Sequence, residues 1–350
     1  MTTHLSYRAL AVQFKTMAVN KCNGRDEARA EMDRSIERLA NQIPAAKSWI
    51  GPDLRLVVVP EYFLTGFPMG DPIDVWADKA GLEVDGPEYE KLSKIAQDND
   101  IYLSGNVYEQ DVHFPGIYFQ CNFIIAPSGD VILRYRRLLS MFSPSPYDFL
   151  DKYLEIYGED ALFPVADTEI GKLGCISSEE VLYPEMVRCT ALNGAEVFCH
   201  SSSEVGSLQM TPKNIAKRAR AIENLAYIVS ANSAGIYNYD MGAGSTDGHS
   251  QIVDYMGLVL IEAGAGESHI AFAEIDLAAV RRYRSRPGMF NILSRQPTDL
   301  YARQYAKTQI YPPNLLINDD GTLKHPQRSF FIERQQGIIE KMKERGIIEE

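Results

Sequence analysis

Two segments of the 350-residue chain carry side chains that can attack an acyl group and assist the attack. Glu61 follows the apolar, β-branched run 55–60, and Ser178 lies between a strand-like stretch at 173–177 and a helix beginning at Pro184. A turn from strand to helix can present a hydroxyl beside free backbone N–H groups, which is how nucleophile turns are built. A carboxylate at a strand end lies where α/β enzymes place reactive groups. Alternatively, Glu61 is a surface acid at a strand end, and 178–180 is a polar connection that caps the helix.

A cluster of three arginines lies within four positions, at Arg134, Arg136 and Arg137, in a chain whose formal net charge is -12. Guanidinium groups gathered in this way can bind an anion or support an oxyanion. The alternative is a solvated edge strand that charge protects from pairing with other chains. A second charged segment, 218–224, is either a solvated helix face or a layer of ion pairs between elements.

Positioning these side chains requires strands and helices, and both types of segment alternate from residue 8 to about residue 285. Hydrophobic periodicity predicts a helix over 25–42 with Ala28, Met32, Ile36 and Leu39 on one face. The remaining predicted helices cover 88–99, 184–193 and 211–224. The predicted strands cover 9–14, 55–60, 101–108, 173–177, 195–200, 227–232 and 270–275. Hairpins are predicted over 120–137 and 250–261. Connections of both the parallel and the hairpin kind indicate an α/β protein whose sheets are covered by helices.

Composition narrows the classes of function. A pI near 5.1 argues against nucleic acid or an anionic membrane as a partner. We expect no signal peptide and no membrane span, because no long apolar run is present. Five cysteines without C-x-x-C spacing suggest reduced thiols in the cytoplasm, and neither a metal nor a cofactor is expected.

Six stretches in order resemble the nitrilase superfamily of carbon–nitrogen hydrolases, over roughly residues 5 to 301. The stretches are PEYFLTGFP from Pro60, CNFIIAPSGDVILRYRR from Cys121, GKLGCISSEEVLYPEMVRCTALNGAEVF from Gly171, RARAIENLAYIVSANSAG from Arg218, GHSQIVDYMGLVL from Gly248 and RQPTDLY from Arg295. Several motifs in the right order and spacing are far more specific than any single one.

The resemblance implies a four-layer α-β-β-α sandwich and a Glu-Lys-Cys triad, in which Glu is the general base, Lys stabilises the oxyanion and Cys forms the acyl-enzyme. Glu61 matches the family's glutamate. Ser178 stands six residues before Pro184, where the family has Cys, and Arg137 stands where it has Lys. The further glutamate that many relatives carry after the lysine is not evident, because the segment reads Ser-Pro-Ser-Pro from Ser143. The resemblance also implies a hydrolase domain over 1–300 and a homodimer or larger homo-oligomer. Residues 301–350 form an extension, in which we expect 329–350 to be a charged terminal helix that either packs on a neighbouring subunit or stays loose.

Cys175 is a poor replacement nucleophile, because it lies three residues before Ser178 inside the strand. Three steps along an extended chain turn its side chain to the opposite face, about 10 Å back. We interpret it as a small buried hydrophobe.

The predicted function is hydrolysis of a small non-peptide amide or nitrile by a Glu61, Arg137 and Ser178 version of the triad. Serine needs a well-placed base, and Arg137 keeps a positive charge but cannot release a proton. The alternatives are an inactive pseudoenzyme that binds a small amide or carboxylate, and a Cys→Ser variant that traps substrate. An acidic ligand would suit a pocket that contains arginine.

Expected substrate-binding residues are Tyr62, Glu179, Tyr183 and Ser203, with Tyr147 as another lining residue. Tyr62 and Tyr183 are alternatively core aromatics. Asn122 and Asn232 are expected to hold backbone, and Glu185 and Arg188 to orient a helix start.

Overall fold

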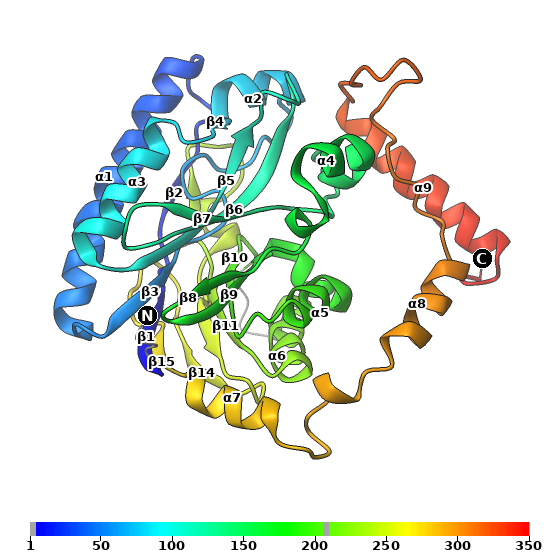
Figure 1. Ribbon diagram of the computed structural model, residues 1–350. Coiled ribbons are helices and arrows are strands. Elements are labelled where there is room, and N and C mark those ends of the chain that lie inside the picture. Colours follow the sequence, from blue (N-terminus) through cyan, green and yellow to red (C-terminus); the bar gives the residue numbers. More distant parts are fainter. Residues whose placement is uncertain (1–4, 206–209, 350) are drawn as a thin grey trace.

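Two β-sheets pack face to face between two layers of helices in the computed structural model, which describes residues 5–205 and 210–349 (Figure 1). This is the α-β-β-α sandwich that the sequence predicts. Each sheet combines parallel and antiparallel pairs, as expected where helical crossovers and hairpins alternate along a chain.

The first sheet has the strand order β15-β1-β3-β5-β6-β7, and β4 pairs with β5. Its strands are β1 (Ser6–Ala11), β3 (Leu54–Val58), β4 (Leu82–Glu83), β5 (Tyr102–Gln110), β6 (Tyr118–Ile125), β7 (Val131–Arg136) and β15 (Phe272–Asp276). The helices α1 (Arg25–Ile50), α2 (Ile73–Ala80) and α3 (Pro87–Asn99) cover its outer face (Figure 1).

The second sheet has the order β14-β13-β11-β10-β9-β8. Its strands are β8 (Ala166–Thr168), β9 (Gly171–Ser177), β10 (Val197–Ser201), β11 (Tyr227–Ala231), β13 (Gln251–Val253) and β14 (Val259–Glu262). The helices α5 (Pro184–Leu192) and α6 (Pro212–Asn224) lie on its outer face. A small pair, β2 (Thr16–Met17) with β12 (Ile236–Tyr237), joins two loops.

Three apolar cores fill the spaces between the layers. One lies under α1 to α3, a second lies between the two sheets, and a third lies under α5 and α6. Cys175 belongs to the core between the sheets and is 5% exposed, which agrees with its interpretation as a small hydrophobe. Burial raises the pKa of its thiol well above the ordinary value, so the thiolate that would attack is disfavoured.

The element boundaries differ from the prediction in a few places. The first strand is Ser6–Ala11 rather than 9–14, because the chain leaves the sheet after Ala11 and Gln13 bridges to Ser268 instead. Helix α1 runs on to Ile50 past Pro44, since its apolar face continues through the buried Ile43, Ala46 and Ile50.

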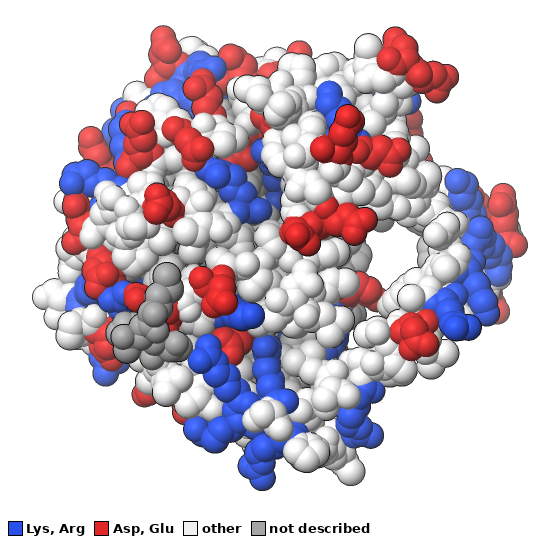
Figure 2. Space-filling model, in the orientation of Figure 1, with Lys and Arg blue, Asp and Glu red and all other residues white. Residues whose placement is uncertain are grey.

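The C-terminal segment leaves the body after α7 (Leu277–Ser285), passes through α8 (Thr298–Lys307) and returns as α9 (Arg328–Glu344) to lie near α4 (Leu150–Tyr157) (Figure 1). Figure 2 shows the opening that this arc encloses against the body. Helix α9 ends at Glu344, before the predicted end at 350. Throughout the described ranges, no helix combines the length and the apolar character needed to cross a membrane.

Candidate active site

The carboxyl ends of parallel strands from both sheets meet at one edge of the sandwich, and a cavity of about 280 Å³ opens there. Glu61 follows β3, Ser178 follows β9 and Ser203 follows β10. Such an edge is where α/β proteins gather reactive groups. The lining residues are Glu61, Tyr62, Phe67, Pro68, Tyr108, Arg137, Ser140, Met141, Phe142, Ser143, Ser178, Glu179, Ser203, Lys213 and Arg328.

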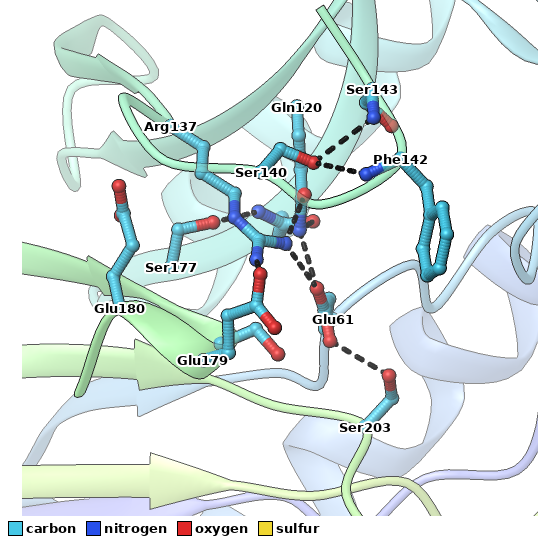
Figure 3. A network of polar contacts seen from close by, with 12 residues as sticks. Glu61, Gln120, Arg137, Ser140, Phe142, Ser143, Ser177, Glu179, Glu180 and Ser203 are labelled. Carbon is cyan, nitrogen blue, oxygen red and sulfur yellow. Dashed lines mark hydrogen bonds and ion pairs between the residues drawn. The ribbon is translucent and has the colours of Figure 1, made fainter. Parts of the chain in front are cut away.

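The Glu61 carboxylate is buried, with 2% of the residue exposed, and three neighbouring groups hold it (Figure 3). Gln120 Nε2 donates to Oε1, Ser203 Oγ donates to Oε2 at 2.7 Å, and Arg137 Nη1 lies 3.7 Å from Oε1. The backbone turns sharply just after it, where Tyr62 has a φ of 53°. Glu61 is therefore not the surface acid that the alternative interpretation required.

Arg137 is buried beside Glu61, and its guanidinium group bonds to the protein on every side (Figure 3). Nε donates to the Leu139 carbonyl at 2.5 Å, Nη1 donates to Gln120 Oε1 at 2.7 Å, and Nη2 donates to Glu179. Burial opposes the charged form, but Glu179 and Glu61 outweigh it and raise the pKa of Arg137. Arg137 is thus a fixed positive charge between two carboxylates.

Ser178 has a left-handed backbone, with φ 47°, at the start of a 3₁₀ turn over Ser178–Leu182. A residue with a side chain is strained there, and such strain is found where a side chain must be presented in one direction. His200 Nε2 lies 2.9 Å from the Ser178 carbonyl oxygen, and Lys213 Nζ donates to Ser178 Oγ at 3.3 Å. The turn therefore places the hydroxyl beside an ammonium group.

Glu180 faces the end of β7 instead of capping α5. Its carboxylate accepts from the N–H groups of Leu138 and Leu139, at 2.9 and 3.0 Å, and from Tyr135 Oη at 2.7 Å. Burial raises the pKa of Glu180 to about 7, against the lowering effect of Arg137 and these donors. The alternative interpretation, in which the acids after Ser178 cap the helix, is wrong for Glu180, because its carboxylate links the turn after β9 to the end of β7.

The structure brings Glu61, Arg137 and Ser178 to one cavity, together with Tyr62, Glu179 and Ser203. Tyr62 is both a lining residue and a packed aromatic, because its ring stacks on Tyr108 at 4.8 Å. Tyr183 is not among the lining residues. It is 44% exposed, because the turn after Ser178 directs it outward.

Two other expected roles also change. Tyr147 lies away from the cavity and donates to the Tyr311 carbonyl. Asn122 binds the side chain of Asn106 rather than the backbone. Asn232 does hold backbone, since its side chain pairs with both the N–H and the C=O of Glu204.

The arginine cluster is neither a free anion site nor a solvated edge. Arg134 pairs with Asp85 and Glu109, and Arg136 pairs with Glu109 and Asp111. The acids lie 25 or more positions earlier in the chain, and the fold brings them to the arginines as ion pairs. On α6, the predicted charged face is partly buried, and Arg220 donates to the Val181 carbonyl at 3.1 Å.

Sequence inspection missed Gln120, Asn106, Lys213 and Arg328. Gln120 and Asn106 did leave a signal, because polar side chains in the middle of strands with otherwise apolar neighbours need a partner. Gln120 bridges Glu61 and Arg137, and Asn106 supports Gln120 from behind. Lys213 and Arg328 left no signal, since the direction of a lysine or arginine side chain depends on the packing of its helix.

A larger hollow of about 740 Å³ lies beside α2, lined by residues such as Asp74, Asp78, Asp111 and His113. Its lining contains no serine, cysteine, lysine or arginine, so the smaller cavity is the better candidate for acyl chemistry. In the described part of the chain, no three His, Cys, Asp or Glu side chains are grouped as they would be around a metal ion.

Comparisons with known proteins show the family of this chain. The carbon-nitrogen hydrolase family matches residues 15–285. A formamidase of Bacillus cereus (strain B4264) is 29% identical over 252 residues, which are 71% of this chain and 70% of the formamidase. The structure of Nit3 of Saccharomyces cerevisiae, a member of the nitrilase superfamily, is similar to this one with a TM-score of 0.62 at 21% identity. The match covers 81% of this chain and 96% of the Nit3 chain. The structure of a mutant amidase from Nesterenkonia sp. AN1 in complex with butyramide is similar with a TM-score of 0.60 at 21% identity. That match covers 86% of this chain and 97% of the amidase chain. Because the family match spans most of the sequence, the chain belongs to the carbon–nitrogen hydrolase family.

Proposed function

We propose that this protein hydrolyses a small amide or nitrile, with Ser178 as nucleophile and Glu61 as general base. The observation that carries the proposal is the convergence of a strained serine, a buried carboxylate and cationic groups on one cavity. The names of the relatives support the amide class, because one is a formamidase and another binds butyramide.

For an amide, Ser178 Oγ would bond to the carbonyl carbon while its proton passes to Glu61. The C–N bond would then break, and ammonia would leave with that proton. Water would attack the acyl-serine, again losing a proton to Glu61, and that proton would return to Ser178 Oγ as the carboxylic acid is released. Gln120, Ser203 and Arg137 would orient the carboxylate for both steps.

The charges around the cavity favour an acyl group that carries a carboxylate. Three cationic residues line it, against two acids. Arg137 neutralises both acids, whereas Arg328 lies over the Phe142 ring, 4.8 Å from its centroid, and forms no ion pair within residues 5–205 and 210–349. Arg328 would therefore bind a second, anionic end of the substrate.

The test is ammonia release from a panel of small amides and nitriles, some with a terminal carboxylate. We expect release by the wild-type protein, loss of it in Ser178→Ala, and a transient mass increase equal to the acyl group. Ammonia release that persists unchanged in Ser178→Ala would show that Ser178 is not the nucleophile.

A second candidate function is binding without turnover. It is favoured by Arg137, whose hydrogen bonds to Glu179, Gln120 and Leu139 leave it poorly placed to serve an oxyanion. In that case amides or carboxylates would raise the thermal midpoint of the wild-type protein, and no ammonia would appear from any of them.

A further inference from the structure

Lys213 is a second positively charged group beside the proposed nucleophile, and it comes from an element that carries none of the predicted catalytic residues. It occupies the first turn of α6, and its ammonium donates to Ser178 Oγ at 3.3 Å. Among the polar contacts described for this cavity, the one made by Ser178 Oγ is with Lys213 rather than with Glu61, which is turned toward Gln120 and Ser203.

Arg137 is poorly suited to stabilise an oxyanion at Ser178. Its three nitrogens bond to Leu139, Gln120 and Glu179, and the whole group is buried between two carboxylates. Moving it toward a substrate would leave those buried acceptors unpaired.

Lys213 has the freedom that Arg137 lacks. An ammonium has three N–H donors, and in the described residues Lys213 forms no ion pair with an acid. It is half-buried at the cavity wall, so one donor can hold Ser178 Oγ while another reaches an oxygen that develops charge next to it.

The fold also fixes the position of Lys213. Thr211 Oγ1 caps the start of α6 by accepting from the Asn214 N–H at 3.2 Å. One turn later, on the same helix face, the fully buried Lys217 pairs with Glu204. Glu204 in turn follows Ser203, which holds Glu61, so the helix start and the base are tied to the same segment.

From these contacts we infer that Lys213 is a catalytic residue, which stabilises the negative charge on Ser178 Oγ and on the adjoining acyl oxygen. This inference rests on the proposed role of Ser178. During attack the Oγ–C bond forms, the carbonyl electron pair moves to oxygen, and the Ser178 proton goes to Glu61. Lys213 donates hydrogen bonds to the two oxygens throughout and keeps its own protons.

The test uses a small fluorophosphonate, because its reaction with an activated serine does not depend on knowing the substrate. Ser178 Oγ bonds to phosphorus, the P–F bond breaks, fluoride leaves, and the serine proton passes to Glu61. The rate is measured by intact-protein mass, and the modified residue is identified by peptide mapping.

We expect the wild-type protein to be labelled at Ser178 and the Ser178→Ala variant to remain unlabelled. The Lys213→Met variant should be labelled about 10² to 10³ times more slowly, because that is the usual effect of losing one oxyanion donor. Lys213→Arg should recover part of the rate. Lys94→Met is the matched control, because Lys94 is 73% exposed on α3 and should leave the rate unchanged. Circular dichroism and thermal midpoints establish that each variant is folded, and Lys213→Gln replaces Lys213→Met if the latter is not.

Labelling of Lys213→Met at the wild-type rate would overturn the inference, and so would a wild-type protein that is not labelled at Ser178. These results are distinct from failure of the proposed function. A protein whose Ser178 is labelled in a Lys213-dependent way, but which releases no ammonia from any amide, keeps the role of Lys213 and loses the proposed reaction.

Discussion

The backbone of Ser178 needs support, since a left-handed conformation at a residue with a side chain is held only by its surroundings. His200 supplies part of that support from β10. Burial lowers the pKa of His200 to about 3, so its ring is neutral at working pH. A carbonyl can only accept, so Nε2 carries the hydrogen that binds Ser178, and Nδ1 accepts from Ser230 Oγ at 2.9 Å.

His200 is therefore a positioning residue, which we expect to act through the direction of Ser178. In His200→Leu the buried carbonyl loses its donor, which should cost about 1 to 3 kcal/mol of stability and slow fluorophosphonate labelling of Ser178. In His200→Gln an amide N–H can replace Nε2–H, so both the unfolding free energy and the labelling rate should recover in large part. Equal labelling rates in the Leu and Gln variants, with both folded, would contradict this role.

Glu180 gives the protein a pH-dependent stability. Its pKa is raised to about 7 in the folded state, so the folded protein keeps this proton between pH 4.5 and 7 while the unfolded chain releases it. The contribution of Glu180 to the free energy of unfolding is fully present below its pKa in the unfolded chain. It is lost as the pH rises through its pKa in the folded protein, by about 3 kcal/mol in total.

Glu180→Gln should remove that slope, because a neutral amide has no proton to lose. Urea unfolding of wild type and variant at intervals from pH 4.5 to pH 8 measures the difference. We expect Glu180→Gln to gain stability relative to wild type across this range. A difference that stays constant with pH would mean that Glu180 is ionised in the folded protein throughout.

Among the arginines, charge alone gave an incomplete interpretation of the sequence. Arg134 and Arg136 look like an anion site on paper, yet Asp85, Glu109 and Asp111 neutralise them in the folded chain. Those acids lie 25 or more positions earlier, and nothing in local spacing indicates which side chains the sheet brings together. Glu61 and Ser178 could be located because each follows a well-marked strand.

At the scale of elements, the periodic segments were predictable and the short ones were not. The hairpin of β6 and β7, the helices α3, α5 and α6, and the strand before Ser178 agree with prediction within a few residues. The short helices α2 and α4, with eight residues each, were missed, because so few residues show little periodicity. Thr211 and Pro212 marked the start of α6 correctly, but they could not reveal that Lys213 points at Ser178.

A buried ion pair, Lys217 with Glu204, holds helix α6 against the loop that follows β10. Lys217 is fully buried and Glu204 is 7% exposed as a residue. Burial lowers the pKa of Lys217, and Glu204 opposes that effect. Burial raises the pKa of Glu204, but Lys217 outweighs it and lowers this pKa below the ordinary value.

Removing one partner should destabilise the protein more than removing both. Lys217→Met leaves Glu204 buried without its cation, and the expected loss is about 3 to 5 kcal/mol. The double variant Lys217→Met with Glu204→Leu should recover much of that loss. A double-mutant cycle measured by urea unfolding gives the coupling free energy between Lys217 and Glu204. Additive effects of the two substitutions would show that the two side chains are not coupled.

For the whole molecule, the segment predicted as an extension contributes to the cavity itself. Phe331 of α9 is 1% exposed and belongs to the core under α1 to α3. Arg334 pairs with the buried Asp148, lies near the rings of Tyr311, Phe330 and Phe331, and donates to the Ser140 carbonyl at 3.3 Å. Helix α9 thus holds the loop from Ser140 to Ser143 over the site. The proposed subunit contact of residues 301–350 stays a prediction, for which the exposed Tyr301 and Tyr305 of α8 are available.

Arg328 should determine which acyl groups the cavity accepts. Arg328→Gln is expected to raise KM for the monoamide of succinic acid by about tenfold or more, since a hydrogen bond to a charged group contributes about 1.5 to 3 kcal/mol. KM for butyramide, which has no carboxylate, should change little. Steady-state ammonia release from both amides measures the ratio, and a parallel change for the two substrates would rule out selective recognition of the carboxylate.

The arrangement of α9 also has a consequence for synthesis of the protein. A ribosome releases Glu61, Ser178 and Lys213 long before it releases Arg328 and Arg334, so a nascent chain can assemble both sheets while one wall of the cavity is still missing. A product that terminates between α8 and α9 would contain Ser178 and Glu61, but the loop from Ser140 to Ser143 would have lost its contact with Arg334. Completion of the cavity wall therefore depends on residues 328–334, which follow Ser178 by 150 or more positions.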